Sequence, residues 1–129
     1  MTSQTRKDQG PGFDLSAYKE LYLEEARKSL ATLRENLIQL RDDAASETAL
    51  HEAHRAAHTL KGMSSTMHYE TLTALARTLE DPLSRADRAK LPPPSDQIRV
   101  FLTTCDDFEA ALERRAQEKT SGDPGDIAR

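Results

Sequence analysis

Residues 23–40 read LEEARKSLATLRENLIQL, and the spacing of their apolar side chains decides the fold. Apolar residues return every three or four positions, which places them on one face of an α-helix and the charged residues on the other. The pattern reaches back to a cap at Asp14 or Ser16 and forward to about Arg41. It therefore predicts an amphipathic helix of about seven turns. The apolar positions of this helix are Leu23, Ala26, Leu30, Leu33, Leu37 and Leu40.

Three further segments show the same helical period, at about residues 46–67, 72–89 and 95–112. The run Pro92-Pro93-Pro94 cannot continue a helix, and Ser95 or Asp96 is expected to cap the last segment. Four amphipathic helices with short connections predict an all-α, antiparallel four-helix bundle. The expected core positions of the last three helices are Ala49, Ala53, Ala56, Leu60, Met63, Met67, Leu72, Leu75, Leu79, Leu83, Ile98, Phe101, Leu102, Cys105, Phe108 and Leu112.

The chain of 129 residues is long enough for one domain with its own core. Residues 1–12 are polar and end in Gly10-Pro11-Gly12, and residues 118–129 are rich in Lys, Ser, Gly, Asp and Pro. We expect both ends to be disordered flanks or linkers. The folded bundle should then occupy residues 13–117, and a bundle that closes its own core needs no second copy, so we expect a monomer.

Composition excludes several classes of function. The net charge of −4 argues against nonspecific nucleic-acid binding, because that needs a basic surface. We see no apolar signal segment and no apolar stretch long enough to span a membrane, so the sequence predicts a cytoplasmic protein without membrane contact. The single cysteine, Cys105, falls at a core position and is expected to be a buried thiol in a reducing compartment.

A polar face of the second predicted helix carries the segment His58-Thr59-Leu60-Lys61-Gly62. On a helix, Lys61 and Gly62 lie one turn after His58 on the same face, which points away from the core. Side chains lean toward the helix N-terminus, so Gly62 leaves the imidazole of His58 uncovered. A glycine inside a helix costs roughly 1 kcal/mol relative to alanine, so its presence there favours a role for an accessible histidine. Neutral imidazole is nucleophilic near neutral pH, and the ammonium of Lys61 can offset an incoming negative charge.

The segment from Ala57 to Met67, followed by Leu79-Glu80-Asp81, resembles the histidine phosphotransfer (HPt) domain at the N-terminus of the chemotaxis kinase CheA. The segment from Tyr18 to Ala26 is similar to the first helix of that family, so the resemblance covers roughly residues 13–115. The motif H-x-x-K-G is weak alone and becomes specific together with the acidic downstream helix and the four-helix pattern.

The resemblance implies an HPt-like bundle that serves as a relay in a two-component, chemotaxis-type signalling system. His58 would accept a phosphoryl group from a separate ATP-bound histidine kinase catalytic domain and pass it to an aspartate of a response regulator receiver domain. Lys61 would support the phosphoryl group, Gly62 would leave room for the partner, and Glu80 would bond the other nitrogen of the His58 ring. The resemblance implies no cofactor, no metal and no ATP site in this chain, which fits either a stand-alone protein or the first domain of a longer kinase.

Three residues depart from the family pattern. His68 stands where the family commonly has a glycine at the turn into the third helix, so it must accept an unusual backbone conformation or the turn must differ. Arg77 stands where the chemotaxis kinases often carry a second histidine of the hydrogen-bond network. Pro82 lies inside the third helix and is expected to kink it near Glu80.

Two alternatives to phosphotransfer follow from the residues alone. His51, His54 and His58 have the spacing i, i+3 and i+7 on one exposed helix face, so a metal site is one alternative. A purely structural or adaptor bundle is the other. Ser64 and Ser65 lie near His58, but no oxyanion-hole motif accompanies them, so we expect both to face solvent rather than to act as nucleophiles.

Overall fold

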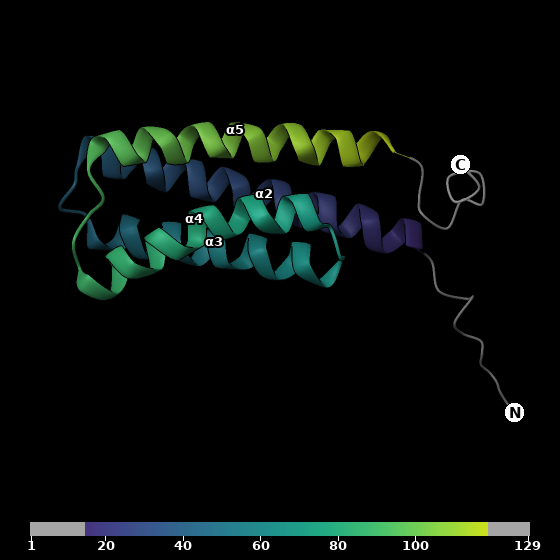
Figure 1. Ribbon diagram of the computed structural model, residues 1–129, viewed down its shortest axis with the longest axis horizontal. Helices are drawn as coiled ribbons and strands as arrows, with labels where there is room; N and C mark the ends of the chain where they lie inside the picture. Colours follow the sequence, from purple (N-terminus) through teal and green to yellow (C-terminus); the bar gives the residue numbers. More distant parts are fainter. Residues whose placement is uncertain (1–14, 119–129) are drawn as a thin grey trace, which may run out of the picture.

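The computed structural model describes residues 15–118 and consists there of four helices (Figure 1). Helix α2 spans Leu15–Asp42, α3 spans Glu47–Thr66, α4 spans Glu70–Ala89 and α5 spans Ser95–Gln117. No strand occurs in this part of the chain, and none of its helices is long and apolar enough to cross a bilayer. The flank predicted for residues 1–12 lies outside the described residues, and so does the flank predicted for residues 118–129 except for Glu118.

Helices that follow one another in the sequence also pack side by side. Helix α3 contacts α2 and α4, and α5 contacts α4 and closes the bundle against α2. The start of α2 and the end of α5 lie at the same end of the molecule (Figure 1). This arrangement confirms the predicted antiparallel four-helix bundle, which short connections favour.

The core contains most of the apolar residues that the helical period selected, but Leu75 of α4 and Leu102 of α5 are only partly buried. Met63 of α3 and Met67 at its C-cap are only partly buried, whereas Leu50 and Ala57, which were not predicted, are buried. The reason is that α3 contacts both α2 and α4, so its buried face is wider than a single stripe. Cys105 is buried as predicted, and burial raises the pKa of its thiol to about 12.

The N-termini of α3 and α5 are capped in different ways. Ser46 caps α3 as its hydroxyl accepts a hydrogen bond from the Ala49 N–H at 3.1 Å. The prediction that Ser95 or Asp96 caps α5 is wrong, because Pro94 is the N-cap residue and makes no side-chain cap bond. Proline can take this place because the N–H that it lacks would have no partner within the helix, and its carbonyl accepts from the Ile98 N–H at 3.0 Å.

Ser64 does not face solvent, contrary to the prediction. Ser64 is fully buried, and its hydroxyl lies 2.8 Å from the hydroxyl of Tyr22 on α2. The Tyr22 ring in turn meets the Tyr69 ring edge to face, with centroids 5.1 Å apart. These contacts fix the last turn of α3, which carries Gly62, against the first helix.

The turn between α3 and α4 is built on His68, whose φ is 61°. The His68 N–H donates to the Ser65 carbonyl at 2.9 Å, and the Tyr69 N–H donates to the Ser64 carbonyl at 3.0 Å. This is the Schellman arrangement, which places the residue after the helix in the left-handed region. Of the two possibilities left open for His68, the unusual backbone conformation is therefore the one adopted.

We expect His68→Gly to stabilise the protein by up to about 1 kcal/mol, because glycine adopts positive φ without the strain that a Cβ causes. Chemical denaturation should show a higher midpoint with an unchanged slope. Thr66→Gly is the matched control, since a glycine inside the last turn of α3 should lower stability. An unchanged or lower midpoint for His68→Gly would contradict the prediction.

Candidate functional site

His58 and Glu80 form a side-chain pair between the middle turns of two neighbouring helices. His58 lies on α3 and Glu80 on α4, and Nδ1 of His58 is 2.8 Å from Oε2 of Glu80. The two side chains differ in exposure: that of His58 is 66% exposed and that of Glu80 only 10%. The imidazole of His58 is therefore open to solvent, and the less exposed Glu80 holds it through Nδ1.

The charge of Glu80 determines which nitrogen of His58 carries the proton. Burial opposes ionisation of Glu80, but the ion pair with Lys61 and the hydrogen bond from His58 lower the pKa of its carboxyl below the usual value. Ionised Glu80 can only accept a hydrogen bond, so Nδ1 of neutral His58 must be the donor. The lone pair of the ring is then on Nε2, the nitrogen that faces away from Glu80.

Lys61 contacts the same carboxylate through its other oxygen. Its Nζ lies 2.6 Å from Oε1 of Glu80, whereas His58 uses Oε2. We expected the ammonium of Lys61 to support an incoming phosphoryl group, but in this structure it neutralises Glu80. Lys61 is half-buried and lies on a flexible stem one turn after His58.

Gly62 lies at the surface of α3 beside the imidazole. A Cβ atom built on Gly62 would meet no atom within 4 Å. The protein's own packing therefore does not require glycine at this position. The open surface agrees with the expectation that Gly62 leaves space for something outside this bundle.

His54 and Asp87 extend the site, and their part in it was not predicted from the sequence. Nδ1 of His54 lies 3.0 Å from Oδ2 of Asp87, and its Nε2 lies 3.9 Å from Oε2 of Glu80. His54 thus stands between two carboxylates of α4. Its position one turn before His58 is readable from the sequence, but no sequence signal marks Asp87 as its partner.

Arg77 and Pro82 have smaller consequences than the sequence suggested. Arg77 is exposed, and among residues 15–118 it has no hydrogen-bond or ion-pair partner, so it does not replace a network histidine. Helix α4 continues through Pro82 as one element, and Glu80 still reaches His58.

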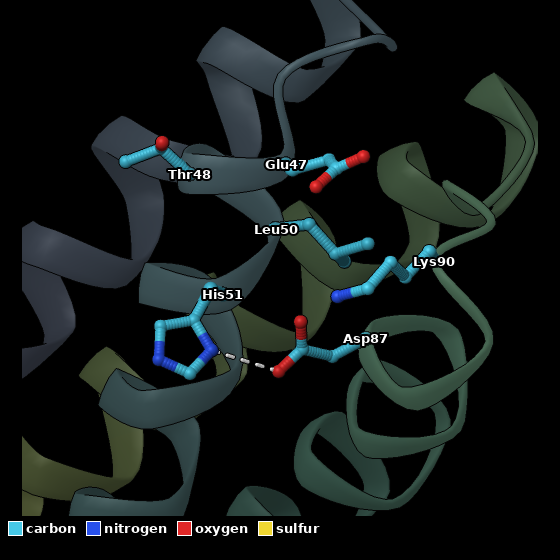
Figure 2. A pocket seen from close by; sticks show the side chains of 6 residues that line it. All are labelled: Glu47, Thr48, Leu50, His51, Asp87 and Lys90. Carbon is cyan, nitrogen blue, oxygen red and sulfur yellow. Dashed lines mark hydrogen bonds and ion pairs between the residues drawn. The ribbon is translucent and has the colours of Figure 1, made fainter.

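The metal site proposed on His51, His54 and His58 is not assembled. His58 bonds to Glu80, whereas His51 and His54 both turn to Asp87, each with Nδ1 3.0 Å from Oδ2. The rings of His54 and His58 are 6.5 Å apart between centroids. Figure 2 shows His51 and Asp87 meeting across a cavity between α3 and α4. Asp87 thus binds two of the three rings, and the third, that of His58, is bound by Glu80 instead.

Comparison with known proteins links this arrangement to one family. Residues 17–118 match the model of the Hpt domain family. Curated relatives are the chemotaxis protein CheA of Bacillus subtilis, 32% identical over 78% of this chain, and that of Klebsiella aerogenes, 31% identical over 86% of this chain. The chain spans only 15% and 17% of the length of these two relatives.

The solved CheA phosphotransferase domain from Thermotoga maritima shares the fold as well. It has a TM-score of 0.72 and 27% sequence identity, and the likeness covers 78% of this chain and 96% of that domain. The family match extends over nearly all the described residues, including the two helices that hold His58 and Glu80. The chain belongs to the Hpt domain family, as a histidine phosphotransfer domain of the kind found in CheA proteins of chemotaxis signalling.

Proposed function

We propose that His58 is the residue that carries the phosphoryl group in this domain. The observation that supports the assignment most strongly is the bond between Nδ1 of His58 and Glu80 at 2.8 Å on an otherwise exposed ring. In the neutral form of the ring, this bond keeps the proton on Nδ1 and leaves the lone pair on Nε2, which faces solvent. The other three histidines are His51 and His54, which are turned to Asp87, and His68, which forms a turn.

The proposed donor is the ATP bound to a histidine kinase catalytic domain. The Nε2 lone pair of His58 forms a bond to the γ-phosphorus while the bond from this phosphorus to the β,γ-bridging oxygen breaks, and ADP leaves. An aspartate oxygen of a response regulator receiver domain then attacks the same phosphorus. The P–N bond breaks and its electron pair returns to Nε2, which restores the starting imidazole.

Three neighbours have proposed supporting roles. Glu80 is a positioning residue that holds the proton on Nδ1 and keeps the ring oriented. The side chain of Lys61 moves from Glu80 toward the phosphoryl oxygens when the negatively charged phosphoryl group reaches Nε2 of His58. Gly62 leaves room for the partner domain, which must approach within bonding distance of the ring.

Residues 13–117 are the proposed functional unit, acting as a monomer with catalysis supplied by another domain. A closed core formed by four helices supports this extent. We place the unit in the cytoplasm because the proposed donor is ATP bound to a kinase. Whether the unit stands alone or precedes further kinase domains does not alter the chemistry at His58.

The test is incorporation of phosphate from labelled ATP, with the catalytic domain of a CheA-type kinase supplied separately. We expect one phosphate per chain, stable in alkali and labile in acid as a phosphoramidate is, and peptide mapping should place it on His58. Addition of a receiver domain should remove the label. A kinase domain that labels another Hpt domain but not this chain, or labels it at another residue, would overturn the proposal.

Gly62→Ala should separate stability from phosphotransfer. The added methyl meets no atom of the protein, so the variant should gain roughly 0.5–1 kcal/mol from the helix preference of alanine. The same methyl occupies the surface proposed for the partner, so the rate of labelling should fall severalfold. Denaturation and labelling time courses measure the two effects.

Ser65→Ala is the matched control for Gly62→Ala. Ser65 is exposed on the same helix, and its replacement improves helix preference without adding an atom. It should label at the wild-type rate. An unchanged rate for Gly62→Ala would contradict a role in partner access, and a loss of stability would contradict the open space at its Cβ.

A further inference from the structure

A second cluster of chemically active side chains lies at the far end of the α3–α4 hairpin from the His68 turn. His51 and His54 project from adjacent turns of α3, and Asp87 comes from the last turns of α4. Both Nδ1 atoms lie 3.0 Å from the same oxygen, Oδ2 of Asp87. Each of the three residues offers a ligand atom within 4.8 Å of the others.

The spacing of these atoms suits a divalent transition-metal ion. Zinc binds histidine nitrogen and carboxylate oxygen at about 2.0–2.1 Å, so two ligands of a tetrahedral site are about 3.3 Å apart. The two observed separations of 3.0 Å are close to this value. Two imidazoles and one carboxylate are also a ligand set that zinc and related ions accept, with a further position left for water.

Burial and access also favour an ion at this place. The side chain of His51 is 55% exposed, which provides a path from solvent, whereas those of His54 and Asp87 are 23% and 18% exposed. His54 and Asp87 already hold one another through their 3.0 Å contact, so little ordering is needed when an ion binds. His51 is thus accessible to an incoming ion, and His54 and Asp87 are already ordered to bind it.

The charges around the cluster add up to a negative site. Glu47 and Lys90 line the cavity with His51 and Asp87 (Figure 2). The opposite charges of Glu47 and Lys90 offset one another, so the carboxylate of Asp87 remains to attract a cation. Glu47 lies one turn before His51 on α3, so its carboxylate can approach the fourth coordination position.

We propose that His51, His54 and Asp87 form a binding site for a divalent transition-metal ion, for which Zn²⁺ is the probe. The ion binds Nδ1 of both histidines and Oδ2 of Asp87. Each metal-bound ring then carries its one proton on Nε2. The site is separate from His58, whose Nδ1 stays on Glu80.

The site borders the phosphoryl-accepting pair through a single residue. Nε2 of His54 lies 3.9 Å from Oε2 of Glu80, the oxygen that holds His58. With an ion on its Nδ1, His54 keeps a proton on this nitrogen and directs it toward Glu80. Direct binding measurements test the metal site whether or not His58 carries phosphate.

The experiment is a titration of the protein, prepared without a polyhistidine tag, with Zn²⁺ in a calorimeter. We expect one ion per chain, and His51→Gln and Asp87→Asn should each weaken binding by at least about tenfold. Tetrahedral Co²⁺ should give its visible absorption bands in the wild type and lose them in both variants. Circular dichroism of each variant verifies that the helices remain.

Two matched histidine controls locate the site. His68→Asn and His58→Gln should bind Zn²⁺ with the affinity of the wild type, because neither residue belongs to the cluster. Asparagine keeps the left-handed backbone that position 68 needs. The proposal is overturned if the wild type does not bind Zn²⁺, if Asp87→Asn binds it equally well, or if His58→Gln loses it.

Discussion

Replacing His58 by glutamine is expected to abolish phosphoryl incorporation, with a loss of more than about a thousandfold in labelling rate. Glutamine keeps a polar group of similar reach, and its amide can still donate to Glu80. It has no nitrogen lone pair that can attack phosphorus, because the amide nitrogen is conjugated with its carbonyl. The fold should persist, since the side chain of His58 is 66% exposed and lies outside the core.

The measurement compares labelling of wild type and His58→Gln by the same kinase catalytic domain. His68→Asn is the control, because it removes another exposed histidine from the same hairpin and leaves the His58–Glu80 pair intact. It should label at the wild-type rate. Residual labelling of His58→Gln at a substantial fraction of the wild-type rate would assign the acceptor to another residue.

Glu80→Gln is expected to lower the labelling rate by roughly 10- to 100-fold, the usual effect of removing a carboxylate that orients a reactive histidine. The carboxylate can only accept, so it holds the proton on Nδ1 of His58 and leaves Nε2 free. An amide can donate as well as accept, and it no longer imposes that tautomer. The effect should be smaller than that of His58→Gln because the nucleophile itself remains.

The same substitution has a stability effect that depends on pH. At neutral pH we expect Glu80→Gln to cost roughly 1–3 kcal/mol of stability, because the ion pair with Lys61 and the charged hydrogen bond with His58 are lost. The pKa of Glu80 is lowered in the folded protein. Its stabilising contribution is therefore complete above the unfolded value of about 4.3 and disappears as pH falls through the lower folded pKa.

Denaturation of wild type and variant across this acidic range tests the prediction. The stability difference between them should shrink as pH falls below about 4.3. Asp81→Asn is the matched control, because Asp81 is the neighbouring carboxylate on α4 and is exposed. It should change neither the labelling rate nor the acid dependence. A Glu80→Gln protein that labels at the wild-type rate would show that Glu80 does not position His58.

The α-helical period allowed the fold to be predicted because it is a local property of the chain. Residues three and four apart share a face whatever the rest of the molecule does, so the helices, most of the core and the outward direction of His58 followed from residue order. The break at Pro92–Pro94 followed from the chemistry of proline in the same way. Helix ends were less certain, as the unexpected N-cap at Pro94 shows.

The site could be predicted only in part. Periodicity gave His58, Lys61 and Gly62 because they lie within two turns of one helix. Glu80 came from the resemblance to a family, since no spacing within the chain relates α4 to α3. The contact at 2.8 Å between Glu80 and His58 agrees with that resemblance.

The sequence by itself determined four helices, their inner and outer faces, and a histidine left uncovered by a glycine. The tertiary structure decided the partners across helices: Lys61 on Glu80, Ser64 on Tyr22, and His51 with His54 on Asp87. These pairings depend on the rotation and the axial position of one helix against the next. Both are set by the packing of all four helices together, and no local pattern in the chain encodes them.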